Sequence, residues 1–242
     1  MLFLPYHSSQ FPQLGLKLNA ALARADLGEI KTQSSDHWHP YQQGIRKGRL
    51  GIYLAPPHFT AWAIRKHKFK AILRLPDKLK YVIASRSADA HLFEMNDLAD
   101  RRVCSQNALN LDFVLVRTSF GTSFLAAENK VVNSVASAMQ YDNQNCDAFS
   151  VSEHLFKEFN LETPYRFIRL QQGNEYNNYA FIAHPDIGNN TLEKLQKFLR
   201  SKDAQTVLGP LLKQFSKRTR LISVKPADYP KSYLEPLDLY WR

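Results

Sequence analysis

Short apolar segments alternate with helical patterns along the N-terminal part of the chain. The apolar residues of the first helical pattern fall on one helix face, at Leu14, Leu18, Ala21, Leu22 and Ala25. The expected elements are strands at 2–4, 30–38 and 50–55 and helices at 14–25 and 40–47. A strand–helix alternation of this kind builds parallel βαβ units, so the sequence predicts an α/β fold.

The same alternation continues towards the C-terminus, interrupted by segments that are typical of paired strands. The further predicted strands lie at 69–75, 80–87, 101–105, 147–151, 165–170 and 179–184, with a strand or loop at 124–127. The further predicted helices lie at 57–68, 112–118, 131–141 and 153–159, and two more follow Asn190 and Ser201. Asn190 and Ser201 are expected N-caps, because Asn and Ser side chains accept a hydrogen bond from the first helical turn.

Polar and aromatic residues directly follow several predicted strands. Tyr6 and His7 follow the first strand, and Pro57 and His58 follow the third. Ser150 closes a strand in the second half of the chain. Parallel sheets bind their ligands at the carboxyl ends of the strands, so these clusters are predicted ligand walls. Helix capping and core packing are the alternative roles for such residues.

The composition fits a globular protein of one large domain or two lobes. The chain has 242 residues, of which 44% are hydrophobic and 22% are charged. No apolar run in the sequence reaches the roughly 18 residues that a membrane-spanning helix needs. Cys104 and Cys146 lack zinc-ligand spacing and are too few for a disulfide scaffold. We expect them to be buried and unpaired, with a disulfide as the less favoured alternative.

The net charge is +10, because Lys and Arg outnumber Asp and Glu by 32 to 22. Such an excess favours anionic partners. The densest basic runs are 65–70 and 213–220, and neither contains a nucleic-acid-binding motif or a spaced set of stacking aromatics. We interpret both runs as solvated faces and expect no nucleic acid partner.

Catalytic and metal-binding patterns are missing from the sequence. It contains no nucleophile elbow, phosphate-binding loop, paired zinc histidines or dinucleotide fingerprint. His37 and His39 would share one strand face and could bind a metal with Asp36 behind them, but no third and fourth ligand is identifiable. We therefore expect neither an enzyme nor a metal or cofactor site.

Five short motifs follow one another in a characteristic order. They are Leu4-Pro-Tyr6, Leu50 to Phe59, Asn96 to Gln106, His184 to Ile187 and Val224 to Tyr229. By this order the chain resembles the type II periplasmic binding proteins over nearly its whole length. Within them it is most similar to the phosphate-, phosphite- and phosphonate-binding components of ABC transporters.

The resemblance implies an α/β fold of two lobes, each a mostly parallel sheet flanked by helices. Residues 1–84 and 175–242 would form lobe 1 and residues 85–174 lobe 2, with hinge crossovers at 80–87 and 167–179. A small polar or anionic ligand would bind between the lobes and pass to an ABC permease. The family is periplasmic, which implies a leader or anchor outside this sequence. The alternative function is extracytoplasmic ligand sensing, with a sensor kinase as partner.

One stretch departs from the pattern of the family. Phosphate- and phosphonate-binding relatives have a hydroxyl-rich run at a helix start in the second lobe, where backbone N–H groups hold the anion. Here the corresponding stretch is 107–113, in which two leucines offer no side-chain donor and Asp112 would repel phosphate. The remaining neutral donors are Ser105, Gln106, Asn107 and Asn110. A phosphonate-like ligand and another small polar molecule with apolar and anionic parts both stay open.

Two aromatic residues, an arginine and two asparagines complete the predicted ligand contacts. Trp38 and Tyr41 are expected to stack on an apolar part of the ligand, with core packing as the alternative. Arg86, just beyond the first crossover, is the expected clamp, because a planar guanidinium pairs with an oxyanion through two hydrogen bonds. Asn174 and Asn178 lie at the second crossover and are expected to contact the ligand or to satisfy backbone groups there.

Overall fold

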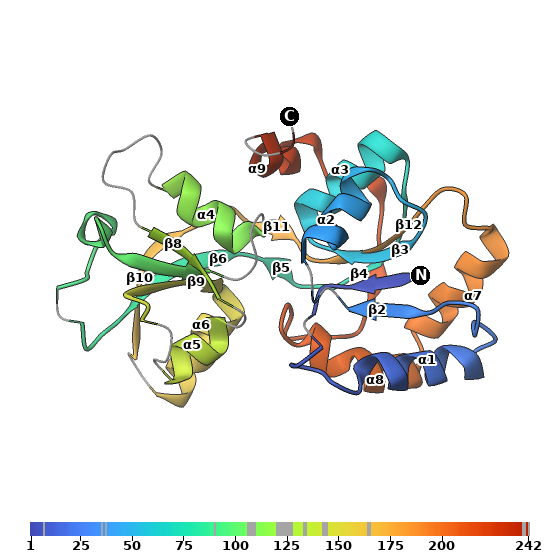
Figure 1. Cartoon of the computed structure of the whole chain (residues 1–242), viewed down its shortest axis with the longest axis horizontal. Coiled ribbons are helices and arrows are strands. Elements are labelled where there is room, and N and C mark those ends of the chain that lie inside the picture. Colours follow the sequence, from blue (N-terminus) through green and yellow to red (C-terminus); the bar gives the residue numbers. More distant parts are fainter. Residues whose placement is uncertain are drawn as a thin grey trace. The chain divides into compact units, whose positions relative to one another are not determined.

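The structure of the chain is a computed structural model (Figure 1). It describes residues 1–6, 8–34, 36, 38–89, 91–105, 110–119, 128–132, 135–141, 145–163, 166–238 and 241. The chain divides into two compact units. Unit 1 contains Met1–Lys78 and Tyr176–Arg242, and unit 2 contains Leu79–Glu175. No helix within the described ranges is long and apolar enough to cross a membrane.

Unit 1 is built on a six-stranded mixed sheet of order β13-β4-β12-β3-β1-β2. Its strands are β1 (Leu2–Leu4), β2 (Thr32–Ser34), β3 (Ile52–Ala55), β4 (Lys70–Arg74), β12 (Ala180–Ala183) and β13 (Ile222–Ser223). Strand β1 pairs in parallel with β2 and β3, whereas β12 pairs antiparallel with both β3 and β4. The strand that returns from unit 2 therefore lies in the middle of this sheet.

Helices cover both faces of the unit 1 sheet (Figure 1). They are α1 (Leu14–Arg24), α2 (Trp38–Arg46), α3 (Pro57–His67), α7 (Asn189–Leu199), α8 (Lys202–Leu212) and the short α9 (Glu235–Asp238). Helices α1, α7 and α8 lie on one face and α2 and α3 on the other. This placement is the one that right-handed crossovers produce when the second crossover reverses direction along the sheet.

Unit 2 contains a five-stranded sheet of order β10-β6-β9-β7-β8. Its strands are β6 (Tyr81–Arg86), β7 (Arg102–Ser105), β8 (Glu128–Val131), β9 (Ala148–Ser152) and β10 (Phe167–Gln172), and its helices are α4 (Leu111–Ser119), α5 (Val135–Tyr141) and α6 (Glu153–Glu162). Val116 of α4 packs in one apolar cluster, and Met139 of α5 and Phe156 of α6 pack in another. The sheet is thus buried on both faces.

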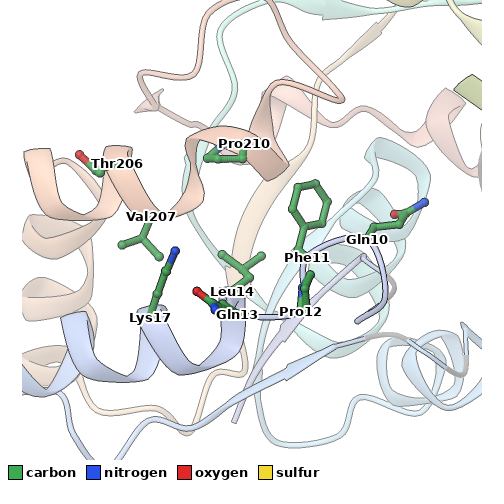
Figure 2. Close-up of a pocket in the computed structure, with 9 residues that line it drawn as sticks. All are labelled: Gln10, Phe11, Pro12, Gln13, Leu14, Lys17, Thr206, Val207 and Pro210. Carbon is green, nitrogen blue, oxygen red and sulfur yellow. The ribbon is translucent and has the colours of Figure 1, made fainter.

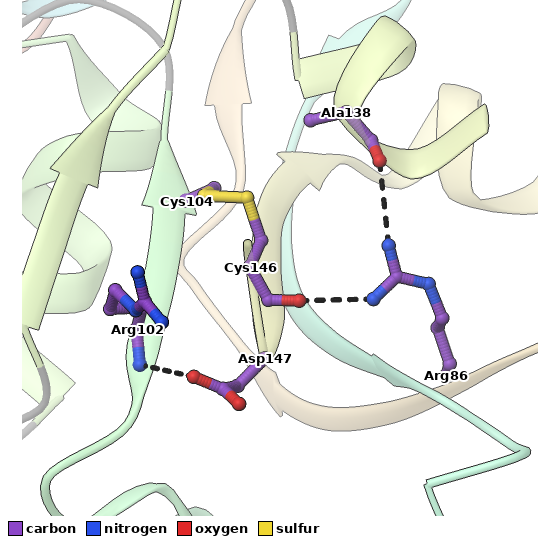
Figure 3. Close-up of a disulfide and its surroundings, with 6 residues drawn as sticks. All are labelled: Arg86, Arg102, Cys104, Ala138, Cys146 and Asp147. Carbon is purple, nitrogen blue, oxygen red and sulfur yellow. Dashed lines mark hydrogen bonds between the residues drawn. A yellow bond between two sulfur atoms is a disulfide. The ribbon is translucent and has the colours of Figure 1, made fainter. Parts of the chain in front are cut away.

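A disulfide joins Cys104 to Cys146, with 5.7 Å between the two Cα atoms (Figure 3). It links β7 to the residues just before β9, and both cysteines are buried. The expectation that the cysteines are unpaired is wrong, because the parallel pairing of β7 with β9 brings the two positions together. The two sulfur atoms meet inside the apolar cluster of α5 and α6.

The chain crosses between the units in two short segments that pair with each other. Strands β5 (Lys78–Leu79) and β11 (Tyr176–Asn177) form a two-stranded sheet. The ammonium group of Lys78 donates a 2.8 Å hydrogen bond to the side-chain oxygen of Asn177. The two passages of the chain are therefore held together by backbone pairing and by one side-chain contact.

The structure corrects several expected elements. Both sheets are mixed rather than mostly parallel, because β6 and β12 enter them antiparallel to their neighbours. Strand β2 is shorter than the predicted 30–38, since α2 already begins at Trp38. Residue 131 ends a strand instead of starting a helix, and Gly188 rather than Asn190 is the N-cap of α7. The predicted strand or loop at 124–127 lies outside the described residues.

Candidate functional site

The carboxyl ends of three parallel strands meet at one edge of the unit 1 sheet. Strands β1, β2 and β3 run in the same direction, and Tyr6, Asp36 and Pro57 follow them within two residues. This is the edge at which parallel sheets collect ligands. The fold thus brings the predicted residues Tyr6 and Pro57 to one side of the unit.

Tyr6 is a buried residue at this edge. Its ring contacts Phe11 edge to face, with 6.0 Å between the ring centroids. Burial and the nearby Asp36 carboxylate raise the pKa of the Tyr6 hydroxyl. Tyr6 therefore remains a neutral hydrogen-bonding group at physiological pH.

Asp36 ties two loops of this edge together. One carboxylate oxygen accepts a hydrogen bond from the backbone N–H of Ser8, in the loop after β1. The other accepts a 2.8 Å hydrogen bond from the hydroxyl of Ser34, at the end of β2. The sequence pattern suggests Asp36 only as a second-sphere group for a metal. The Ser34-x-Asp36 spacing, which is typical of local side-chain turns, is the signal that indicates its actual role.

The start of α3 forms the third part of the edge. Pro57 occupies its first turn, where a missing N–H costs no intrahelical bond. The hydroxyl of Thr60 donates to the carbonyl oxygen of Ala55 at 3.1 Å and fixes the strand-to-helix turn. His58 is fully buried against Phe59, with 4.3 Å between the ring centroids. The structure places His58 in the packing of this turn, and its contact with a ligand stays a prediction.

Tyr41 belongs to α2, and its side chain is buried. Its hydroxyl donates a 2.6 Å hydrogen bond to the carbonyl oxygen of Leu54 in β3. Its ring meets Tyr53 edge to face at 6.1 Å, and burial holds the Tyr41 pKa well above the usual value. These contacts fit the packing alternative for Tyr41. Trp38 begins α2, and the placement of its side chain lies outside what the structure describes.

A cavity of about 410 Å³ lies between the start of α1 and α8 (Figure 2). Its lining is mostly apolar and consists of Gln10, Phe11, Pro12, Gln13, Leu14, Lys17, Thr206, Val207 and Pro210. Phe11 connects it to Tyr6 through their ring contact. The sequence pattern does not reveal this cavity, because its walls come from segments nearly 200 residues apart in the chain. Lys17 is its single charged group.

In unit 2, polar residues of β9 and of the start of α4 lie together. The side-chain oxygen of Asn110 accepts a hydrogen bond of 3.0 Å from the backbone N–H of Leu111, at the start of the helix. Asp112 lies in the first turn and is only 1% exposed. Its carbonyl oxygen accepts a 2.8 Å hydrogen bond from the hydroxyl of Ser150 in β9. The structure thus brings the predicted residues Asn110 and Ser150 to the same helix start.

A carboxyl group suits the position of Asp112 in the first turn of α4. A helix N-terminus carries partial positive charge and stabilises an anion there. This chain places its own carboxyl group, that of Asp112, in the first turn of α4. The electrostatic field of α4 is therefore already opposed by a group of the protein.

Arg86 lies at the end of β6 within the packing of unit 2. Its guanidinium donates to the carbonyl oxygens of Cys146 at 3.0 Å and Ala138 at 3.4 Å (Figure 3). The guanidinium carbon also lies 4.6 Å from the centre of the Phe149 ring. These contacts assign Arg86 a structural role, and the predicted clamp stays untested.

The two asparagines of the second crossover differ in their surroundings. Asn174 is exposed, whereas Asn178 is fully buried. The amide nitrogen of Asn178 donates to the carbonyl oxygen of Phe215 at 2.7 Å, and its amide oxygen accepts from the backbone N–H of Tyr179 at 2.7 Å. Asn178 thus satisfies backbone groups of unit 1, which is one of the two roles expected for it. Its other expected role, contact with a ligand, stays a prediction.

Three predicted ligand residues, His7, Gln106 and Asn107, lie outside the described part of the chain. His37, one of the two histidines weighed as metal ligands, lies outside it as well. His39 falls within α2 rather than on a strand. Among the described residues, no group of three or more His, Cys, Asp or Glu is arranged to hold a metal ion.

No family model matches this sequence, and no curated protein matches it. Solved structures match it over almost the whole chain. XAC2383 from Xanthomonas citri, bound to ATP, has 12% sequence identity and a TM-score of 0.70, with 98% of this chain and 97% of that chain covered. PhnD1 from Prochlorococcus marinus, in complex with methylphosphonate, has 14% identity and a TM-score of 0.71, with 98% and 96% covered.

A third similar structure comes from Pseudomonas aeruginosa. It is a binding protein component of an ABC phosphonate transporter, with 11% identity, a TM-score of 0.67, and 98% of this chain and 84% of that chain covered. At such identities the similarity establishes the fold and leaves the ligand open. The chain has the two-sheet α/β fold of the type II periplasmic binding proteins.

Proposed function

We propose that this protein is a solute-binding protein that captures a small polar or anionic ligand and delivers it to an ABC permease. The observation that carries the proposal is the whole-chain structural similarity to binding proteins, two of which are described with phosphonates. Polar residues at the strand ends of each unit, Tyr6 in unit 1 and Asn110 in unit 2, would supply contacts. The protein acts by binding and not by catalysis.

The ligand carries a hydrogen-bond donor or an ammonium group beside its oxyanion. This part of the proposal is supported by two carboxylates, Asp36 at the strand ends of unit 1 and Asp112 in the first turn of α4. Like charges repel strongly where water is excluded, so both groups disfavour a fully anionic ligand. A zwitterionic phosphonate, or a similar small molecule, carries both the oxyanion and the ammonium group that this proposal requires.

The protein acts outside the cytoplasm, in the periplasm. The Cys104–Cys146 disulfide supports this location, because structural disulfides persist in oxidising compartments and are rare in the cytosol. Cell fractionation followed by thiol labelling without reductant tests it. A cytosolic protein with two labelled cysteines would overturn this assignment.

A thermal-shift and calorimetry panel tests the ligand class. The panel contains phosphate, phosphite, methylphosphonate, 2-aminoethylphosphonate, a sulfonate and amino acids. A ligand at 100 times its dissociation constant stabilises the native state by about 2.7 kcal/mol, so a true ligand is clearly visible. We expect 2-aminoethylphosphonate to stabilise the protein more, and to bind more tightly, than methylphosphonate. Silence across the whole panel would remove the phosphonate class.

The isosteric variant Asp112→Asn tests the electrostatic argument. It keeps the shape of the side chain and removes the charge, so affinity for methylphosphonate should rise relative to that for the zwitterion. Asp26→Asn is a matched control, because Asp26 pairs with Lys194 on the surface of unit 1. Unchanged selectivity in Asp112→Asn would show that this carboxylate does not shape ligand choice.

A further inference from the structure

The positive charge of the chain is concentrated in one stretch. Residues 37–76 contain eight of its 32 Lys and Arg residues and none of its 22 Asp and Glu residues. Outside this stretch the two signs nearly balance. The net charge of the protein is therefore mostly a property of α2, α3, β4 and the loops that join them.

The fold brings these charges to one edge of unit 1. Strands β3 and β4 begin at the same edge, because Ile52 and Lys70 both pair with Ala183 of β12. Helices α2 and α3 end there, where the Nε2 atom of His67 lies 2.7 Å from the carbonyl oxygen of Arg46. Trp62 Nε1 donates to the same oxygen at 3.4 Å. This edge is opposite to the strand ends that carry Tyr6 and Pro57.

We name this surface the basic edge. It comprises Arg46, Lys47, Arg49, Arg65, Lys66, Lys68 and Lys70. All but Arg46 are exposed. Cations near a helix C-terminus stabilise the helix by interacting favourably with its dipole, but that effect is confined to the last turn of each helix. Lys47, Arg49, Lys68 and Lys70 lie beyond the helix ends and are not explained by it.

Few acidic groups oppose the basic edge. The acids at this end of the sheet include Asp26, Glu29, Asp186 and Asp203, and Asp203 pairs with Arg24 of α1. Asp26 pairs with Lys194 of α7, and Asp186 lies 3.5 Å from His184. Lys70 donates to the neutral side chain of Asn189. The edge therefore keeps a strong positive excess.

An apolar side chain projects among these charges. Leu50 follows Arg49 directly and is 64% exposed. Large aromatic side chains at the edge are not exposed among the described residues, since Phe69 is buried and Trp62 is half-buried under Lys66. A nucleic-acid-binding surface for single strands would need exposed stacking aromatics, whereas a lipid surface is matched by spread cations and an inserted leucine.

We propose that the basic edge binds the surface of an anionic phospholipid membrane. Clustered Lys and Arg side chains are attracted to acidic headgroups, and Leu50 enters the boundary between headgroups and acyl chains. Bound in this way, unit 1 presents the opposite edge, with Tyr6 and Pro57, to the solution. The inference concerns a surface apart from the ligand contacts and does not depend on the ligand.

Vesicle co-sedimentation of the full chain tests the proposal. The protein is mixed with phosphatidylcholine vesicles and with vesicles that also contain phosphatidylglycerol, at low and at high salt. We expect binding only to the anionic vesicles and its loss at high salt, because salt screens exposed charges. Absence of binding to anionic vesicles at low salt would overturn the proposal.

Two variants of equal net charge separate a specific edge from general basicity. The test variant carries Lys47→Gln, Arg49→Gln, Lys66→Gln and Lys68→Gln, and the control carries Lys17→Gln, Lys213→Gln, Lys217→Gln and Arg220→Gln. Each cation near an anionic surface strengthens binding roughly fivefold, so the test variant should bind more than about a hundredfold more weakly. The control should keep most of its binding. Equal losses in both variants would refute a localised site.

Two further measurements complete the test. Leu50→Ser should weaken vesicle binding without changing its dependence on salt, and circular dichroism should show each variant folded. Duplex DNA is the competing anion. Binding to DNA that the test variant loses, without binding to anionic vesicles, would assign the edge to nucleic acid and overturn the lipid proposal.

Discussion

Arg86 donates a hydrogen bond of 3.0 Å from its guanidinium to the carbonyl oxygen of Cys146, the residue that is disulfide-bonded to Cys104 (Figure 3). A second hydrogen bond reaches Ala138 of α5. One side chain thus joins the end of β6, α5 and the segment before β9. These contacts brace unit 2, and the predicted role of Arg86 as a ligand clamp stays a prediction.

Replacing Arg86 by Ala should lower the free energy of unfolding by about 2 kcal/mol, because charge-assisted hydrogen bonds to two carbonyl groups are lost. Urea denaturation measures this. Arg169→Ala is the matched control, since Arg169 also lies over a ring, that of Phe156, but makes its ion pair near the surface. It should cost less than about 1 kcal/mol. A stable Arg86→Ala protein with lost ligand affinity would instead support the clamp.

Reducing the disulfide should destabilise unit 2. The bond closes a loop with a sequence separation of 42 residues, and loop-closure entropy for that length corresponds to about 4 kcal/mol at most. Thermal melting with and without reductant should show a lower midpoint under reducing conditions. The double variant Cys104→Ala and Cys146→Ala should melt at the lower midpoint in both conditions. A reductant effect that persists in this variant would contradict the assignment.

The two asparagines of the second crossover provide a matched pair. Asn178→Ala should cost about 2–3 kcal/mol, because it leaves the buried carbonyl of Phe215 and the N–H of Tyr179 without their partners. Asn174→Ala should change stability by less than about 0.5 kcal/mol, since Asn174 is exposed. Chemical denaturation of both variants decides this. Equal effects would mean that burial does not distinguish the two positions.

Stability should fall at alkaline pH through Tyr53. Burial raises the pKa of Tyr53 from 10.0 to about 12, so the unfolded chain releases this proton first as the pH rises. The unfolded state then binds fewer protons than the native state, and the free energy of unfolding decreases between these two pH values. Tyr53→Phe should show a shallower decline over that window. In the native protein, the tyrosinate absorbance that is lost in Tyr53→Phe should appear near pH 12 and not near pH 10.

The periodic apolar pattern predicted the early βαβ elements well, because each buries its own face. The helix at 14–25 and the strand at 50–55 match α1 and β3 to within two residues. Ser201 caps α8 as expected, with its hydroxyl accepting from the N–H of Ala204. These elements were predictable because apolar periodicity and helix capping depend on residues that are close in the sequence.

Contacts between distant segments were beyond the sequence pattern. The partners of Arg86 lie 52 and 60 residues away, and the disulfide depends on the parallel register of β7 and β9. Tyr41 offered an aromatic ring to either a ligand or the core, and only the position of Leu54 in β3 favours the core. The sequence pattern identifies residue types that suit a binding site. Which of these residues instead stabilise the fold depends on tertiary packing.

The central position of β12 affects the order in which the chain folds. All four of its residues are fully buried between β3 and β4, yet they are synthesised after the whole of unit 2. Unit 2 is continuous, so a growing chain has every strand of that sheet available while the other sheet still has a gap in its middle. During synthesis we therefore expect the sheet of unit 2 to be complete before that of unit 1.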